Sequence, residues 1–347
     1  MENLASCGQK LIRWKDLTTK RQEGYRVGVL HLHSIFSRDV PKLAKNMPDI
    51  LVCKALREGA DYVAITDHDN DDGWRQASYR HPAWIRGTEM EVHDESIGYP
   101  VHFGILNIGG DNLFEELWDI AHRRRSACRL VDTALQNGAT VIANHPWWCP
   151  QGYRLNSVGL WDLVETFRLP VEVNSKRSLV ENVATLIYAA QRNLPVVATT
   201  DSHTRRVLPT CTLARGDTPE EFLANIRRGQ TYIVPGYAGF FQLPAMMTRY
   251  VLDVIQAHLA YGFYEGPVKL GAGGLLDRLL AGISHSRLTD RLFTRQLASI
   301  TAGLLTYLVG TFGYIPYTYA ASTYKVLKDM YLRSAHGAAP LPEFISE

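Results

Sequence analysis

The segment HLHSIFS, residues 31–37, follows the apolar run VGVL at residues 27–30, and Asp39 comes shortly after it. Alternate side chains of a β-strand share one face, so His31 and His33 are expected to point the same way at the end of a buried strand. Two neighbouring imidazoles can bind a metal ion, but two ligands do not fill a coordination sphere. The segment therefore predicts further ligands downstream.

Six similar runs follow. Each is short, rich in Val, Ile or Ala, and carries His, Asp, Glu or Asn at or near an end. The complete set is Val27–His33, Tyr62–His68, Trp84–Glu91, Val101–Ile108, Thr140–His145, Val171–Asn174 and Val196–His203. Such continuous apolar character is typical of strands buried on both faces. Stretches with helical period lie at 42–58, 113–136, 179–192 and 219–228.

Alternation of strands and helices predicts a parallel α/β fold, and in a (β/α) barrel the carboxyl ends of the strands meet on one face. Seven runs rather than eight predict an incomplete barrel. Only about nine residues separate the third run from the fourth, which is too few for a crossover helix. We expect a lead-in at 1–24, a barrel domain at 25–235 and a helical C-terminal region at 236–347.

The composition excludes several classes of protein. The chain has 37 basic and 35 acidic residues, which argues against long nucleic acid as a partner. Its five cysteines are scattered, with no C-x-x-C pair, which argues against a zinc finger and a disulfide framework and fits a reducing compartment. The first 16 residues lack the apolar core of a secretory signal, so a cytoplasmic location is expected.

The C-terminal region contains one uncharged stretch, residues 296–324. Its length would suffice for a membrane helix, which needs roughly 20 apolar residues. It is, however, rich in Thr, Ser and Tyr, and it contains glycines and Pro316. A buried or oligomer-forming helix is therefore favoured over membrane association of this region.

Polar side chains gather at the ends of the runs: His31, His33, Asp39, Asp67, His68, Glu89, His102, His145, Asp201 and His203. A buried histidine or carboxylate must be paired or bind a metal, and so many on one face would repel each other without cations. Imidazole and carboxylate without thiolate suit zinc, manganese or iron. The number of ligands predicts two or three divalent metal ions, with a carboxylate such as Glu89 as a bridge.

At this point the sequence resembles a known family. The motifs HLHSIFSRD, AITDHD, GTE, NHP and TDSH occur in the order found in the PHP family, named after polymerase and histidinol phosphatase. The resemblance covers residues 27 to 235. It implies a distorted seven-stranded (β/α) barrel, a metal cluster that is often trinuclear, and hydrolysis of phosphate esters.

The resemblance also implies a role for each ligand. The first metal site would be formed by His31, His33, Glu89 and Asp201. The second would be formed by Glu89, His102 and His145, and the third by Asp39, His68 and His203. Asp39 follows Arg38, where many relatives have Ser-Asp-Gly. Asp67 would orient a ligand, and the E-x-N pair of Glu172 and Asn174 would support the site.

A metal-dependent phosphoesterase is the leading prediction, with a nucleotide or a small phosphorylated metabolite as substrate and a metal-activated hydroxide as nucleophile. Arg177, at the end of the sixth run, is expected to bind the phosphate, with Arg205 and Arg206 as weaker candidates. His203 is the candidate proton donor to the leaving group.

Two alternatives stay open. The first is hydrolysis of a C–N bond, as in amidohydrolases, but these usually carry a metal-bridging lysine and no lysine ends any run. The second is a metal-stabilised module whose C-terminal region binds a partner or a membrane.

Overall fold

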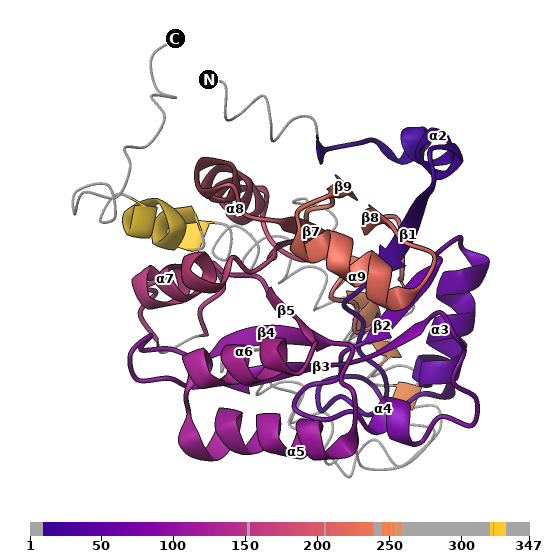
Figure 1. Cartoon of the computed structure of the whole chain (residues 1–347), viewed down its shortest axis with the longest axis horizontal. Helices are drawn as coiled ribbons and strands as arrows, with labels where there is room; N and C mark the ends of the chain where they lie inside the picture. Colours follow the sequence, from indigo (N-terminus) through magenta and orange to yellow (C-terminus); the bar gives the residue numbers. More distant parts are fainter. Residues whose placement is uncertain are drawn as a thin grey trace, which may run out of the picture.

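The structure is a computed structural model of the 347-residue chain. It describes residues 10–150, 153–204, 206–238, 245–246, 248–250, 252–253, 256–257, 320–321 and 323–330. Within these residues a single curved sheet forms a nearly closed barrel with helices around it (Figure 1). The predicted fold class, an α/β barrel, is confirmed.

All seven predicted runs contain strands. The described strands are β1 (Tyr25–Val29), β2 (Tyr62–Ile65), β3 (Trp84–Val92), β4 (Val101–Leu106), β5 (Thr140–Ala143), β6 (Val171–Asn174), β7 (Val196–Thr199), β8 (Cys211–Arg215) and β9 (Thr231–Val234). The sheet has the order β7-β6-β5-β4-β3-β2-β1-β8-β9. The predicted count of seven strands is wrong, because β8 and β9 extend the sheet beyond β1.

The helices are α2 (Leu17–Gln22), α3 (Pro48–Arg57), α4 (Asp72–Arg75), α5 (Asp111–Asp119), α6 (Ala127–Gln136), α7 (Val158–Phe167), α8 (Leu179–Arg192) and α9 (Pro219–Arg227), with short 3-10 turns at Trp14–Asp16 and Ala44–Asn46 and a π-helical turn at Ile120–Arg124. The predicted helix at 113–136 is two helices. Arg125 has a φ of 51°, which ends the first. Ser126 then caps α6 by accepting a hydrogen bond from Arg129 N.

Strands β3 and β4 form an antiparallel hairpin, in line with the short connection between their runs. Glu89 pairs with Gly104, and Glu91 pairs with His102. Strand β4 is also antiparallel to β5, whereas β1–β2, β2–β3, β5–β6 and β6–β7 are parallel. The amino end of β4 therefore lies at the same rim of the barrel as the carboxyl ends of its neighbours.

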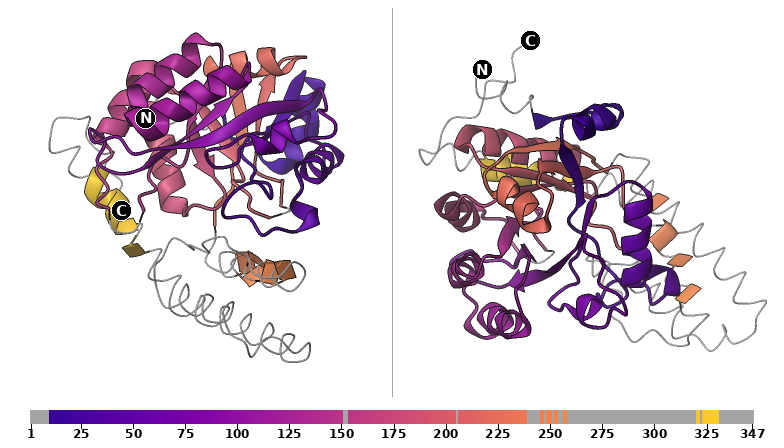
Figure 2. Two further views of the ribbon diagram at one scale, coloured as in Figure 1. Left: turned by 90° about the horizontal axis from the view of Figure 1, so that it is seen from below. Right: turned by 45° about the vertical axis from the view of Figure 1, so that its right-hand side comes forward.

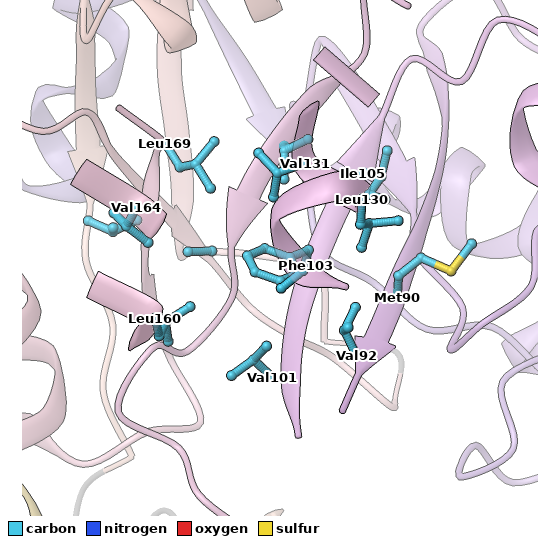
Figure 3. Packing of buried hydrophobic residues seen from close by; sticks show 14 of the residues in the cluster. Met90, Val92, Val101, Phe103, Ile105, Leu130, Val131, Leu160, Val164 and Leu169 are labelled. Atoms are coloured by element: carbon cyan, nitrogen blue, oxygen red, sulfur yellow. The ribbon is translucent and has the colours of Figure 1, made fainter. Parts of the chain in front are cut away.

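Successive side chains of a strand point to opposite faces of the sheet. The core therefore has two layers, one between the sheet and the helices and one inside the barrel. In β4, Val101, Phe103 and Ile105 pack outward against the helices, and Leu106 packs into the barrel interior. Figure 3 shows Phe103 among side chains from the strands and from α6 and α7, including Val131 and Leu160. His102 shares the inward parity of Leu106, which directs its imidazole into the barrel.

Backbone and side-chain contacts close the barrel. At the carboxyl rim, His33 N donates a hydrogen bond to Ser202 O at 2.9 Å, and Leu32 forms an isolated β-bridge with Ser202. Lower down, Thr212 on β8 accepts a hydrogen bond from Ala198 N of β7 at 2.8 Å. Helix α9 then fills the amino end, where fully buried Phe222 packs against Tyr62 with ring centroids 4.9 Å apart. Apolar side chains, including those of α9, fill the amino end of the barrel interior. The inward-facing polar side chains gather at the opposite end, the carboxyl rim.

Segments outside the predicted barrel domain also contact it. Leu11, in the predicted lead-in, forms an isolated β-bridge with Ile233 of β9. Near the C-terminus the helical residues 323–330 lie beside α7 and α8 (Figure 2), and Ser157 N donates to Asp329 at 3.1 Å. Strand β9 ends at Val234, close to the predicted domain boundary. The division into a barrel domain and a C-terminal region stays a prediction.

Most of the uncharged stretch 296–324 lies outside the described residues. No helix within the described residues has the length and apolar character of a membrane span.

Candidate metal centre

The nine predicted metal ligands all lie at the carboxyl rim. His31 and His33 extend from β1, His68 follows β2, and Glu89 lies near the end of β3. His102 is the second residue of its antiparallel strand, His145 follows β5, and Asp201 and His203 follow β7. Asp39 lies on the connection from β1 to α3. The fold thus brings together residues that are spread over most of the barrel sequence.

Glu89 is the centre of this cluster and is fully buried. Its Oε2 atom lies 3.3 Å from His31 Nε2 and 3.4 Å from His33 Nε2. The same oxygen lies 3.2 Å from His68 Nδ1. One carboxylate oxygen therefore faces nitrogens from three imidazoles on two neighbouring segments.

The second oxygen of Glu89 faces the other side of the cluster. Its Oε1 atom lies 3.3 Å from His102 Nδ1 and 3.1 Å from His145 Nε2. It also accepts a hydrogen bond from Asn144 Nδ2 at 2.9 Å. Glu89 therefore lies between two groups of histidines, and its role as a bridge between metal ions stays a prediction.

Several buried atoms in the cluster make no hydrogen bond to any described residue. They are Glu89 Oε2, His68 Nδ1 and His102 Nδ1. Buried polar groups without hydrogen bonds are costly, and a cation bound where these three atoms converge would satisfy them. Imidazole nitrogen and carboxylate oxygen are donors that suit zinc, manganese or iron, and the residues present fit such divalent cations.

A second group of donors surrounds Asp39, and we call it the Asp39 site: His33, Asp39, His68 and His203. Asp39 Oδ2 lies 2.5 Å from His203 Nε2 and 3.3 Å from His68 Nε2. One donor atom from each of these four residues lies within 4.8 Å of the others. The placement of Asp39 behind Arg38 therefore still brings its carboxylate into the cluster.

Asp201 lies between the two halves of the cluster. Its Oδ1 atom is 3.3 Å from His33 Nε2 and 3.7 Å from His31 Nε2. His203 Nδ1 lies 3.4 Å from the same oxygen. The backbone of Asp201 has a φ of 45°, a left-handed conformation that is uncommon outside glycine.

Two cations follow β6 and reach this carboxylate. Lys176 Nζ lies 3.4 Å from Asp201 Oδ1 and contacts His203 Nδ1. The guanidinium of Arg177 lies 3.8 Å from Asp201 Oδ2 and 5.5 Å from the centre of the Trp148 ring. Arg177 Nε is buried and makes no hydrogen bond within the described residues. The predicted phosphate-binding arginine therefore stands beside the cluster.

Lys176 was not predicted as a site residue. It comes two residues after β6, beyond the end of the sixth run, and its ammonium contacts the predicted ligand His203. Trp148 was also not predicted. Its ring lies 4.8 Å from that of His102 and 5.4 Å from that of His145. Arg206 is exposed, and Arg205 lies outside the described residues.

Buried carboxylates hold the imidazoles in place. Glu172 Oε1 is 2.6 Å from His31 Nδ1, and its Oε2 accepts from His145 N at 2.7 Å and from Asn174 Nδ2 at 3.0 Å. Asp67 accepts from Ser34 N and Ser34 Oγ, both at 2.6 Å, which fixes the backbone next to His33. The predicted supporting roles of Glu172, Asn174 and Asp67 are compatible with these contacts.

The cluster perturbs the protonation of its members. Burial alone would lower the pKa of His31, but the carboxylates of Glu89 and Glu172 raise it well above its usual value. Burial would raise the pKa of Glu89, but His31 and His102 hold it well below its usual range. A similar balance brings the pKa of His102 to about 9. His145 differs, because burial and, to a smaller extent, the positive charge of Arg177 lower its pKa to about 4.

The sequence and the fold were compared with those of known proteins. No family model matches the sequence, and no curated protein matches it. Among solved structures, the chain is similar to a two-domain protein from Bacteroides vulgatus containing a predicted PHP-like metal-dependent phosphoesterase, with 17% identity, 65% of this chain and 70% of that chain covered, and a TM-score of 0.45. It is also similar to PsfC from Pseudomonas syringae, with 16% identity, 68% and 99% covered, and a TM-score of 0.45. A further match is an amidohydrolase from Chromobacterium violaceum, with 15% identity, 59% and 97% covered, and a TM-score of 0.39.

Replacing Glu172 by Gln is expected to weaken metal binding by about 10- to 100-fold, because an amide cannot accept hydrogen bonds on both sides as this carboxylate does. Competition between the protein and a chelating dye for Zn²⁺ measures the change. Glu116→Gln, at an exposed position of α5, is the matched control. Equal affinities in the two variants would contradict a supporting role for Glu172.

Proposed function

We propose that this chain is a metal-dependent phosphoesterase that hydrolyses the phosphate ester of a nucleotide or a small phosphorylated metabolite. The observation that carries the proposal is the convergence of six imidazoles on buried carboxylates centred on Glu89, with Lys176 and Arg177 beside them. The proposed metal ligands are His31, His33, Asp39, His68, Glu89, His102, His145, Asp201 and His203. Bound divalent cations would supply an activated water and neutralise charge on the phosphoryl oxygens.

The protein's own residues would bind and orient the substrate. Arg177 has a buried Nε that makes no hydrogen bond within the described residues, and a guanidinium can bind two phosphoryl oxygens at once. Trp148 packs against this guanidinium and limits its orientation. Lys176 adds a point charge on the same side of the cluster. These two cations would neutralise charge that develops during displacement at phosphorus.

His203 has two proposed roles, and they compete. Its Nε2 atom faces Asp39 at 2.5 Å, while its Nδ1 atom is close to Asp201 O and to Lys176. One nitrogen cannot bind a metal and donate a proton at the same time. The placement of Nε2 among the donors of the Asp39 site favours the role of a ligand over that of a proton donor.

Hydrolysis of a C–N bond is the second candidate, because Lys176 removes the objection that no lysine lies at the rim. Lys176 contacts His203 on its Nδ1 side, however, and Glu89 already occupies the centre between the histidines. This arrangement favours the phosphoesterase.

The test is a turnover assay of the full chain on p-nitrophenyl phosphate, on nucleoside monophosphates and on N-acylated amino acids. We expect phosphate release that stops after treatment with a chelator and returns with Mn²⁺ or Zn²⁺. Turnover that survives complete metal removal, or that is confined to the amides, would overturn the proposal.

A further inference from the structure

The described residues between 245 and 257 are helical and have one buried face. The partly or fully buried positions are Met246, Thr248, Tyr250, Asp253 and Ala257. Four of them, Met246, Tyr250, Asp253 and Ala257, are spaced by four, three and four residues. The intervening Arg249, Leu252 and Gln256 are exposed. This spacing is that of one face of a helix packed on a partner. Figure 2 shows these residues, in orange, beside α3 and the connection that leads to it from β1.

Two side chains of this face bind that connection. Tyr250 Oη donates a hydrogen bond to the backbone oxygen of Asp39, with a distance of 2.6 Å. Asp253 forms an ion pair with Lys45, which lies in the short 3-10 turn before α3. The two contacts join residues that are 211 and 208 positions apart in the sequence. The C-terminal region therefore touches the backbone of a proposed metal ligand.

The other hydrogen bonds of this connection are local or come from the barrel sequence, as from Asn70 Nδ2 to Phe36 O at 3.3 Å. Lys42 Nζ donates to Ser37 O at 3.2 Å, and Asn46 Nδ2 donates to Pro41 O at 2.9 Å. Ser37 Oγ donates to Asp39 Oδ1 at 2.8 Å. These bonds fix the loop's internal shape. Tyr250 binds it from outside the barrel sequence, at the residue whose carboxylate faces His203 and His68.

We propose that Tyr250 is a positioning residue for the Asp39 site, so that the C-terminal region sets the affinity of one metal ion of the cluster. The inference rests on the proposed function, because it requires the cluster to bind metal. The hydroxyl fixes the peptide group of Asp39 and thereby the position of its carboxylate. Loss of this hydrogen bond weakens the Asp39 site and leaves the site of His31, His33 and Glu89 intact.

The test compares the full chain with its Tyr250→Phe variant after chelator treatment, by calorimetric titration with Mn²⁺. We expect one class of site to bind about tenfold more weakly in the variant, the lower end of the range for residues that support ligands, and the remaining affinity to be unchanged. Phosphate release should fall at low Mn²⁺ and recover at high Mn²⁺ with kcat unchanged. Tyr79→Phe, at a position that is 64% exposed, is the matched control.

The outcomes separate the two proposals. Failure of the unmodified protein to bind Mn²⁺ overturns the proposed function and this inference together. Normal binding by the unmodified protein with an identical isotherm for Tyr250→Phe overturns the inference alone, as does an equal weakening of every site. If Tyr250→Phe does not fold, Lys45→Met removes the second contact of the same helix and carries the same expectation.

Discussion

Replacing Glu89 by Gln is expected to abolish metal-dependent turnover and to remove most of the bound metal. The carboxylate faces five imidazoles through two oxygens, and one of those oxygens makes no hydrogen bond to a described residue. An amide has the same shape but carries no charge to balance cations. Because metal ions contribute several kcal/mol to transition-state stabilisation, kcat/KM should fall by about a thousandfold or more.

The measurement combines elemental analysis of the purified variant with steady-state kinetics on p-nitrophenyl phosphate. Glu220→Gln is the control, because Glu220 is exposed in the first turn of α9. The control should keep its metal content and activity. A Glu89→Gln protein with full metal content and ordinary kcat/KM would show that this carboxylate is not a ligand.

Without metal, the protein should lose stability as the pH rises from 6.5 to above 9. The pKa of His102 is about 9 in the folded chain, against an ordinary value of 6.5. A raised pKa stabilises the fold below pH 6.5, and this contribution disappears as the pH passes through the folded value. For His102 the loss is about 3 kcal/mol. His31, whose pKa is also raised, changes in the same direction.

Urea unfolding at pH 6.5 and pH 9.5 measures this change on chelator-treated and metal-loaded protein. The loaded protein should not show the loss, because metal ions bind neutral imidazole. His102→Gln is the internal control and should reduce the pH dependence of the metal-free form. A metal-free protein that is equally stable at both pH values would contradict the charge balance described for the cluster.

Much of the barrel could be predicted from the sequence, because buried strands leave continuous apolar runs. The runs at Val27–His33 and Val196–His203 ended at polar residues that the fold does bring together. Strands β8 and β9 were missed. Each is four or five residues long, β8 ends at exposed Arg215, and neither ends in a predicted ligand. Only their packing beside β1 and β7 makes them part of the sheet.

Contacts between residues that are distant in the sequence limit how much of the site could be predicted. Lys176 meets His203 from 27 positions away, and Tyr250 meets Asp39 from 211 positions away. Neither residue has a pattern in its own neighbourhood that distinguishes it from an ordinary surface Lys or Tyr. Trp148 lies close to a predicted ligand in the sequence, but its position beside Arg177 depends on where β6 ends.

The antiparallel hairpin of β3 and β4 has a consequence for how the centre assembles during folding. Glu91 and His102 are 11 residues apart, whereas Asp39 and His203 are 164 apart. Closing the shorter loop costs about 2 kcal/mol less entropy, at about 0.6 kcal/mol for each doubling of length. Since local contacts form fastest, Glu89 and His102 can be placed before the barrel closes. The hairpin would then be a template onto which the histidines from the two ends of the barrel sequence are added last.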